Sequence, residues 1–482
     1  MSNRPETNKQ SCPVYKKCGG CQLQNLSYPE QLEFKQRKVE KLLKRFCTVE
    51  KIIGMKTPYH YRNKVQAAFY TDKKGKIISG VYQSGSHHVV GIDSCQTEDV
   101  IADKIIVAVR KLLPSFRMTT YNEDTGKGFL RHILVKRGFA TNQIMLVLVT
   151  GTPVFPSKNN FVKAILKQFP EITTIVQNIN PYRTNLVLGD NQKVLYGKGY
   201  IEDILCGCRF RISPKSFYQI NPVQTEVLYG KAIEFANLKG NETVLDTYCG
   251  IGTIGIIAAK NGAGNVIGAE LNGDAVRDAI VNARANNLKN IRFYKADAGE
   301  FMREAADEDE KPDVVFMDPP RAGSDRKFLD SLIKMSPKKV VYVSCNPETL
   351  ARDLAYLTQN SPYKAQKIQP VDMFPHTAHI ETVVLLSKGE VDSKKIRVEF
   401  SLEDMDMSEF QDGATYTQIK DYVLEHSGLK VSNLYISQIK RKCGIGVGKN
   451  YNLPKSEDSR QPQCPPEKEK AIREAFKYFG II

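Results

Sequence analysis

Four short apolar runs in the second half of this chain each end at an acidic residue. The acidic residues are Asp246, Glu270, Asp297 and Asp318, and amphipathic segments separate the runs. Buried strands alternating with helices predict the α/β class with a largely parallel sheet. Such folds bind ligands beyond the carboxyl ends of their strands, so we expect these carboxylates at one edge of the sheet.

The residues after the runs indicate the kind of ligand. A glycine turn, Gly250-Ile251-Gly252, follows Asp246 and permits close approach of a nucleotide-like molecule. Glu270 could accept hydrogen bonds from two ribose hydroxyls, and Asp297 could read an adenine edge. The carboxylates would repel the pyrophosphate of a dinucleotide but suit the cationic S-adenosylmethionine, which favours methyl transfer over hydride transfer. Arg321 follows Asp318-Pro-Pro where an aromatic residue would be expected for attack by an exocyclic amine, which argues against that reaction.

A cysteine follows a later apolar run. Lys339 to Val343 reads as a buried strand, and Pro347 suits the first turn of a helix, so Cys345 is placed at the junction. We expect the nearby amide groups and the helix dipole to favour its nucleophilic thiolate form. The alternative is a buried structural cysteine. Glu381 precedes a further strand and is either a partner for Cys345 or a solvated surface residue.

Four cysteines near the amino terminus form a second candidate site. Cys12, Cys18 and Cys21 make a C-x5-C-G-G-C pattern, and Cys95 comes later. Four thiolates suit an iron–sulfur cluster or a tetrahedral zinc ion. The spacing favours the cluster, since zinc sites more usually pair two C-x2-C hooks; unliganded loop cysteines are the third possibility. Cys47 lies outside the pattern and is expected to pack in a core.

The charge balance points to a polyanionic partner. The 482 residues carry a formal net charge of +16, which suits nucleic acid. Pro58 to Lys64 mixes aromatic and basic residues, as expected for binding unpaired RNA bases, although a hairpin edge would look similar. Arg131, His132 and Arg137 place charge around the apolar positions of a strand, which would give a substrate-facing sheet if the opposite face is core. No apolar run is long enough for a membrane span and the start does not resemble a signal peptide, so we expect a cytoplasmic protein.

The chain divides into four regions in this interpretation. Residues 1–100 carry the iron–sulfur segment and the start of an RNA-binding region, and 101–212 form a central α+β substrate-positioning region. Residues 213–390 form a Rossmann-like domain, and 391–482 a helical extension after a polar linker at 389–395. The extension resembles a helix-turn-helix with a basic end at Lys440-Arg441-Lys442. It is either an accessory nucleic-acid-contacting module or a small bundle for stability or protein contact.

The motifs together resemble the tRNA and rRNA uracil-5-methyltransferase family. The resemblance covers residues 12–388 and rests on C-x5-C-G-G-C, F-Y-Q-x-N, D-x-Y-C-G-x-G-T, D-P-P-R, V-S-C-N-P and H-x-E-T-V. It implies a [4Fe–4S] cluster on Cys12, Cys18, Cys21 and Cys95. It implies contacts to S-adenosylmethionine by Gln219, Tyr248, Glu270 and Asp318, with Cys345 as nucleophile and Glu381 as base.

The resemblance also suggests the substrate. It favours 23S rRNA, because cluster-bearing relatives mostly act there; tRNA is the alternative with the same chemistry. A non-catalytic iron–sulfur RNA-binding protein is the alternative from another class. Some relatives carry a TRAM-type β-barrel before the cysteines, and this sequence has none there, so the resemblance does not define the target nucleotide.

Overall fold

The computed structural model describes residues 12–83, 86, 88–184, 186–308, 311–388, 416–445, 463–479 and 481. The expected linker at 389–395 lies outside these residues. The chain divides into two compact units, Met1–Asp392 and Ser393–Ile482. Each is described separately below.

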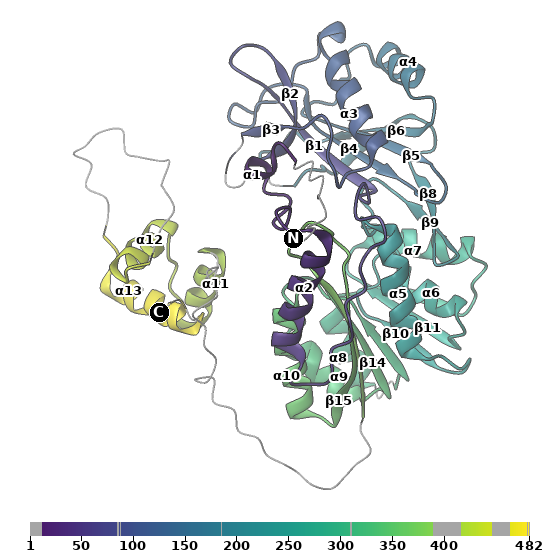
Figure 1. Cartoon of the computed structure of the whole chain (residues 1–482), viewed down its shortest axis with the longest axis vertical. Helices are drawn as coiled ribbons and strands as arrows, with labels where there is room; N and C mark the ends of the chain where they lie inside the picture. The colour runs from purple at the N-terminus through teal and green to yellow at the C-terminus, as the bar shows by residue number, and fades with distance from the viewer. Residues whose placement is uncertain are drawn as a thin grey trace, which may run out of the picture. The chain divides into compact units, whose positions relative to one another are not determined.

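The first unit contains a seven-stranded sheet in the order β3-β2-β1-β4-β5-β6-β7 (Figure 1). The strands are β1 (Lys64–Thr71), β2 (Ile77–Tyr82), β3 (Val89–Gly91), β4 (Leu130–Arg137), β5 (Ile144–Thr150), β6 (Ile172–Ile179) and β7 (Asn191–Tyr196). All neighbours pair antiparallel except β5 and β6, which are parallel and joined through α4 (Lys158–Gln168). Helix α3 (Val100–Leu112) packs on β1, β2 and β4, and a short 3-10 turn, Pro114–Phe116, follows it.

Two residues of β4 correct an expectation. Arg131 and His132 are buried, with 2% and 4% of their surface exposed, so they do not face a substrate. Arg131 forms an ion pair with Glu123 at 2.7 Å and donates hydrogen bonds to the carbonyls of Asn180 and Tyr182. Its charge is therefore satisfied inside the protein, which the local sequence pattern could not reveal.

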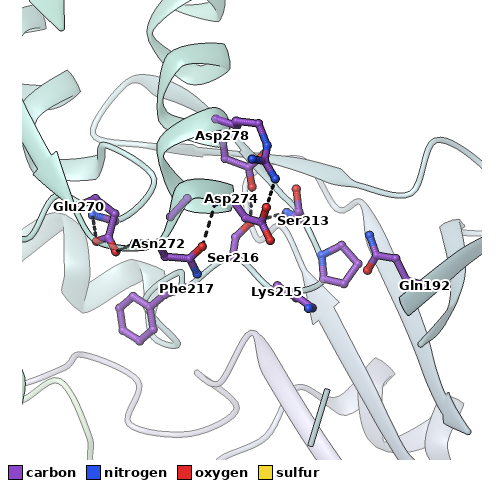
Figure 2. Close-up of a pocket in the computed structure, with 13 residues that line it drawn as sticks. Gln192, Ser213, Lys215, Ser216, Phe217, Glu270, Asn272, Asp274 and Asp278 are labelled. Carbon is purple, nitrogen blue, oxygen red and sulfur yellow. Dashed lines mark hydrogen bonds and ion pairs between the residues drawn. The ribbon is translucent and has the colours of Figure 1, made fainter. Parts of the chain in front are cut away.

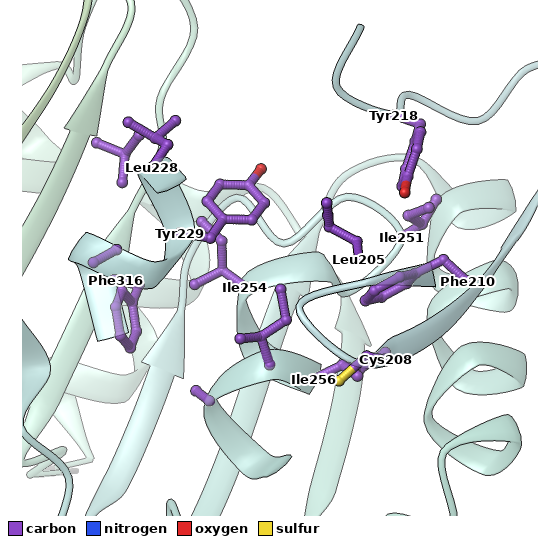
Figure 3. Packing of buried hydrophobic residues seen from close by; sticks show 14 of the residues in the cluster. Leu205, Cys208, Phe210, Tyr218, Leu228, Tyr229, Ile251, Ile254, Ile256 and Phe316 are labelled. Atoms are coloured by element: carbon purple, nitrogen blue, oxygen red, sulfur yellow. The ribbon is translucent and has the colours of Figure 1, made fainter. Parts of the chain in front are cut away.

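A two-stranded hairpin links this sheet to the next part of the unit. It consists of β8 (Ile201–Leu205) and β9 (Cys208–Ile212), which turn through Cys206 and Gly207, both with positive φ. Figure 3 shows side chains of the hairpin, among them Leu205 and Phe210, in one buried cluster with residues of the following elements. The hairpin thus joins the core beneath the second sheet.

The second sheet has the order β12-β11-β10-β13-β14-β16-β15. Its strands are β10 (Thr243–Asp246), β11 (Asn265–Glu270), β12 (Ile291–Lys295), β13 (Val314–Met317), β14 (Lys339–Ser344), β15 (Tyr363–Val371) and β16 (Glu381–Lys388). The first five strands in this order are parallel, whereas β16 runs antiparallel to both β14 and β15. The parallel order confirms an α/β fold.

Helices cover both faces of the second sheet (Figure 1). One face carries α5 (Pro222–Ala236), α6 (Thr253–Lys260) and α7 (Gly273–Ala285). The other carries α8 (Ala298–Asp307), α9 (Arg326–Met335), α10 (Pro347–Asn360) and α2 (Tyr28–Leu43), which follows the short α1 (Tyr15–Cys18). Because α2 packs on α10 and β15, the segment after the first cysteines is part of the layer covering this sheet.

Within the described part of the second unit, three helices surround a small core. They are α11 (Tyr416–Ser427), α12 (Asn433–Lys442) and α13 (Pro466–Tyr478). Ser432 caps α12 by accepting a hydrogen bond from the Tyr435 amide, as its position before the apolar run predicts. The core includes Ile419, Ile436 and Phe476. Among the helices that the structure describes, none combines the length and the apolar character needed to cross a bilayer.

Candidate functional site

A cavity of about 460 Å³ opens at the carboxyl ends of the parallel strands in the second sheet. We call it the reaction cavity. Six residues singled out in the sequence line it: Gln219, Tyr248, Glu270, Asp318, Cys345 and Glu381. They come from the loop before α5, from the ends of β10, β11, β13 and β14, and from the start of β16. Its volume is typical of small-molecule sites.

Cys345 and Glu381 reach the reaction cavity from neighbouring antiparallel strands. Ser344, the last residue of β14, pairs with Thr382 in β16. Cys345 directly follows Ser344, and Glu381 directly precedes Thr382. The next residue, Asn346, caps α10 by accepting a hydrogen bond from the Glu348 amide at 3.1 Å, which anchors the turn carrying the thiol.

The electrostatics of Cys345 differ from the expectation. Burial, together with the carboxylates of Glu381 and Asp318, raises the pKa of its thiol to about 11, although Arg321 acts to lower it. The prediction that the thiolate is favoured is therefore wrong for the protein without ligands. Desolvation and two nearby carboxylates outweigh the amide groups and the helix dipole.

Four acidic residues, Asp246, Glu270, Asp318 and Glu381, line the reaction cavity. Burial raises the pKa of Asp318 and of Asp246 to about 7, and it raises the pKa of Glu381 well above its usual value. Asp246 accepts a hydrogen bond from the Gly255 amide through Oδ2, but its buried Oδ1 has no partner among the described residues. Arg321 lines the same cavity. A cationic ligand would stabilise the ionised form of these carboxyl groups.

The turn between β10 and α6 shapes the side of the reaction cavity next to β11. Glu270 accepts hydrogen bonds from the amides of Gly250 and Asn272, at 3.0 and 2.7 Å. Gly250 and Gly252 both have positive φ, a conformation that glycine adopts without strain. A Cβ atom at Gly252 would approach the Phe293 ring to 2.8 Å, so the turn also needs glycine for packing.

Two further residues that the sequence predicts to contact S-adenosylmethionine, Gln219 and Tyr248, lie on other walls of the cavity. Gln219 donates a hydrogen bond to the hydroxyl of Tyr229 at 3.4 Å, and its carbonyl accepts one from Asn63. Tyr248 packs its ring against Phe328, with the ring centroids 5.5 Å apart. Both side chains are only partly buried and so accessible to a ligand.

Asp297 occupies a different position from the other predicted residues. It is exposed and caps α8, accepting hydrogen bonds from the amides of Gly299 and Glu300. Among the described residues, those lining the reaction cavity do not include Asp297.

Two residues that the sequence analysis missed also line the cavity, Tyr229 and Phe374. Neither carried a recognisable signal in the sequence, because each lies outside the strand ends that mark such a site.

A second cavity of about 300 Å³ adjoins the first. Phe217, Gly250 and Glu270 line both cavities. Figure 2 shows Glu270 and Phe217 at one end of this adjoining cavity and Gln192 at the other. Inside it, Ser216 donates a hydrogen bond to Asp278 at 2.6 Å, and Asp274 pairs with Arg277.

The four amino-terminal cysteines face one small space. Cys12, Cys18, Cys21 and Cys95 all line a cavity of about 20 Å³. Burial, and to a smaller extent the other three thiols, raises the pKa of Cys21 to about 12. Yet no set of three or more Cys, His, Asp or Glu side chains within the described ranges is arranged to hold a metal ion. The space accommodates one water-sized group, so a cluster would require these side chains to adopt other rotamers.

Cys47 lies apart from this set. It is partly exposed and contacts the carbonyl of Thr48 at 3.5 Å. It also borders the hydrophobic cluster on one face of the second sheet, as a packing role would predict.

The sequence of this chain is similar to those of known RNA methyltransferases. A sequence model of the family described as tRNA (Uracil-5-)-methyltransferase matches residues 183–389. An uncharacterized RNA methyltransferase of Bacillus cereus is 44% identical over 391 residues, which cover 80% of this chain and 84% of that protein. One from Listeria monocytogenes is 46% identical over 379 residues, covering 78% and 83%.

A solved structure agrees with the sequence relatives. The Pyrococcus abyssi tRNA (uracil-54, C5)-methyltransferase, crystallised with S-adenosyl-L-homocysteine, is 30% identical and superposes with a TM-score of 0.65. The match covers 76% of this chain and 85% of that one. With sequence relatives, a solved relative and the sheet order in agreement, this chain belongs to the RNA (uracil-5-)-methyltransferase family.

Proposed function

We propose that this protein methylates carbon 5 of a uridine in RNA, with S-adenosylmethionine as the methyl donor. The observation that carries the proposal is the common location of Cys345, Glu381 and the acidic strand ends in one cavity. The relative from P. abyssi, which was crystallised with S-adenosyl-L-homocysteine, supports the choice of donor.

The chemistry accounts for these residue types. Carbon 5 of uracil is a poor nucleophile. The Cys345 thiol first loses its proton to solvent, and the resulting thiolate adds to carbon 6, which moves the electrons of the ring double bond into an enolate with a nucleophilic carbon 5. The methyl group moves from the donor sulfonium to carbon 5. Glu381 then removes the proton from carbon 5, and the sulfur–carbon bond breaks to restore the double bond and the thiolate. The base must leave its stack to enter the cavity, which favours an unpaired target.

We assign the donor contacts to the polar residues of the cavity. Glu270 would accept hydrogen bonds from the ribose hydroxyls, and Asp318 would face the cationic part of the donor. Gln219 and Tyr248 complete the set. Asp297 remains the predicted contact to the adenine edge, although its cap on α8 already uses one carboxylate oxygen.

Covalent trapping tests the reaction. RNA containing 5-fluorouracil should form a stable adduct with the enzyme, because fluorine cannot leave carbon 5 as a proton. The adduct should disappear in Cys345→Ala. A protein that binds the RNA without any adduct would instead fit the non-catalytic alternative.

Glu381 is tested separately. With ordinary RNA, Glu381→Gln should transfer the methyl group and then release the methylated RNA slowly, because proton removal is impaired. Normal turnover in this variant would eliminate Glu381 as the base.

We propose 23S rRNA as the substrate, based on the resemblance of the four-cysteine pattern. A tRNA substrate is the second candidate, favoured by the description of the matched family and by the activity named for the P. abyssi relative. Mapping of 5-methyluridine in rRNA and tRNA from cells with and without the protein distinguishes them. The missing modification identifies the substrate.

We also propose that Cys12, Cys18, Cys21 and Cys95 hold a [4Fe–4S] cluster. Their convergence on one cavity and their all-thiol chemistry support this assignment. Bound there, such a cluster would cross-link the amino-terminal segment to the region just before α3 and could supply redox chemistry.

The second unit is proposed as an accessory nucleic-acid-contacting module. The exposed Arg441 and Lys442 at the end of α12 support this role. Deletion of residues 391–482 should lower RNA affinity while leaving the affinity for S-adenosylmethionine unchanged. Unchanged RNA affinity and site choice would favour a helical bundle with another purpose.

A further inference from the structure

The segment between β15 and β16, residues 372–380, connects the amino-terminal region to the reaction cavity. Phe374 lines that cavity, and Glu381 follows directly after the segment. We call residues 372–380 the approach loop. Glu381 pairs with Val371 at the end of β15, so Asp372, the first residue of the approach loop, directly follows the ladder partner of Glu381.

A buried ion pair fixes the start of the approach loop. Lys35 of α2 contacts Asp372 at 2.5 Å, and both side chains have 0% of their surface exposed. The same ammonium group donates a hydrogen bond to the carbonyl of Phe374 at 3.0 Å. Tyr28 donates to the other carboxylate oxygen of Asp372 at 3.0 Å and accepts from the Met55 amide at 2.6 Å. Both of these hydrogen bonds from the Lys35 ammonium group therefore go to the approach loop.

The middle of the approach loop is held in an unusual conformation. His376 has a φ of 69°, a left-handed conformation that is unfavourable for a residue with a side chain. Gln31 of α2 contacts both its amide and its Nδ1, at 2.9 and 3.2 Å. The carbonyl of His376 accepts a hydrogen bond from the Leu23 amide, and the Nε2 atom of His376 contacts the carbonyl of Pro58. Segments from the amino-terminal part therefore hold this conformation in place.

Stability alone does not explain the ion pair. Buried pairs gain little net stability over apolar residues of similar volume, because desolvation offsets the attraction between the charges. What such a pair provides is a defined geometry, since an ammonium group and a carboxylate must meet at one distance. Here that geometry is imposed on the loop leading to Glu381.

We infer that Lys35, through Asp372, is a positioning residue for the proton-removal step carried out by Glu381. The inference rests on the proposed function of Glu381 as the base. It goes beyond that function by assigning a role in catalysis to the helix that follows the cysteine motif. Lys35 itself touches no substrate.

The test uses Lys35→Met, which keeps the length of the side chain but removes its charge. With ordinary RNA we expect methyl transfer to occur and the methylated covalent adduct to accumulate. Its release should slow by about tenfold or more, as expected for a displaced catalytic group. Arg37→Met is the matched control, because Arg37 lies on the same helix, is exposed and forms an ion pair with Glu33. It should release product at the wild-type rate.

A double variant separates positioning from general damage. If Lys35 acts through Glu381, then Lys35→Met combined with Glu381→Gln should release product no more slowly than Glu381→Gln alone. The inference would be overturned if the double variant released product more slowly than Glu381→Gln, so that the two defects multiplied. It would also be overturned if Lys35→Met released product at the wild-type rate. Should Lys35→Met fail to fold, Tyr28→Phe removes one hydrogen bond to Asp372 while keeping the ring, and should slow the same step to a smaller extent. Normal release in Tyr28→Phe would then overturn the inference.

The outcomes also separate this inference from the proposed function. Absence of a 5-fluorouracil adduct in the wild-type enzyme would reject the covalent mechanism as a whole. A normal wild-type adduct and slow release in Glu381→Gln, together with normal release in Lys35→Met, would reject only the positioning role.

Discussion

Cys345 and Glu381 flank the paired residues Ser344 and Thr382 at one end of the β14–β16 ladder. The antiparallel direction of β16 creates this relationship, because the end of β14 then meets the start of β16. If β16 ran parallel to β14, Glu381 would lie at the opposite edge of the sheet. The single strand reversal therefore brings the proposed nucleophile to the proposed base.

The raised pKa of Cys345 predicts a pH-dependent trapping rate. Burial and neighbouring carboxylates raise this pKa to about 11, so the reactive thiolate fraction grows with pH over the neutral range. Adduct formation with 5-fluorouracil RNA should accelerate about tenfold per pH unit between about pH 7 and about pH 9. Single-turnover trapping measures it. Arg321→Gln should slow the reaction at each pH, since Arg321 lowers this pKa; a flat profile would contradict the prediction.

Asp318 should destabilise the free protein at neutral and alkaline pH. Burial raises its pKa in the folded state from 3.8 to about 7, so the folded protein retains a proton that the unfolded chain releases. Stability is consequently lost as the pH rises through this window, by about 1.4 kcal/mol for each unit of pKa difference.

Thermal unfolding without the donor tests this effect. Asp318→Asn should melt at a higher temperature than the wild type at about pH 8 but not at about pH 4, where both side chains are neutral. The exposed Asp307, which pairs with Lys334, provides the control Asp307→Asn. The same Asp318→Asn variant should bind S-adenosylmethionine more weakly. A lower melting temperature at both pH values would contradict the expected cost of the buried charge.

Glu270 and Asp274 should differ in their effect on donor affinity. Glu270 accepts from the amides of Gly250 and Asn272 through different carboxylate oxygens, so Glu270→Gln keeps an acceptor for only one of them and loses the charge proposed to bind the ribose hydroxyls. Affinity for S-adenosylmethionine should fall by about tenfold or more, as for loss of a hydrogen bond to a charged group. Asp274→Asn changes only the adjoining cavity and should bind normally. Titration calorimetry measures the affinity of both variants for S-adenosylmethionine. If both variants lost the same affinity, the bound S-adenosylmethionine would have to extend across both cavities.

Cys21 and Cys47 form a matched pair for the cluster proposal. Cys21 faces the space shared with three other thiols, whereas Cys47 lies elsewhere. Protein purified anaerobically should be brown and contain iron and sulfide, and Cys21→Ala should lose both while Cys47→Ala keeps them. A colourless wild-type protein that contains zinc would contradict the cluster and indicate that the four thiols bind a zinc ion instead.

The sequence alone determined the local structure and the edge of the sheet where the cavity forms. Apolar runs ending at Asp246, Glu270 and Asp318 predicted parallel strands, because strand burial and helix periodicity are short-range properties of the chain. The turn that carries Cys345 followed from the strand before it and the proline after it. The start of α12 after its cap residue Ser432 follows from a local signal of the same kind.

Only the tertiary structure decided the electrostatics and the long-range contacts. The protonated state of Cys345 depends on carboxylates from other strands, and the burial of Arg131 depends on Glu123 and distant carbonyls. The contact between Lys35 and Asp372 joins residues at opposite ends of the first unit. Such features arise from desolvation and from charges brought together by folding, and no local sequence pattern encodes them.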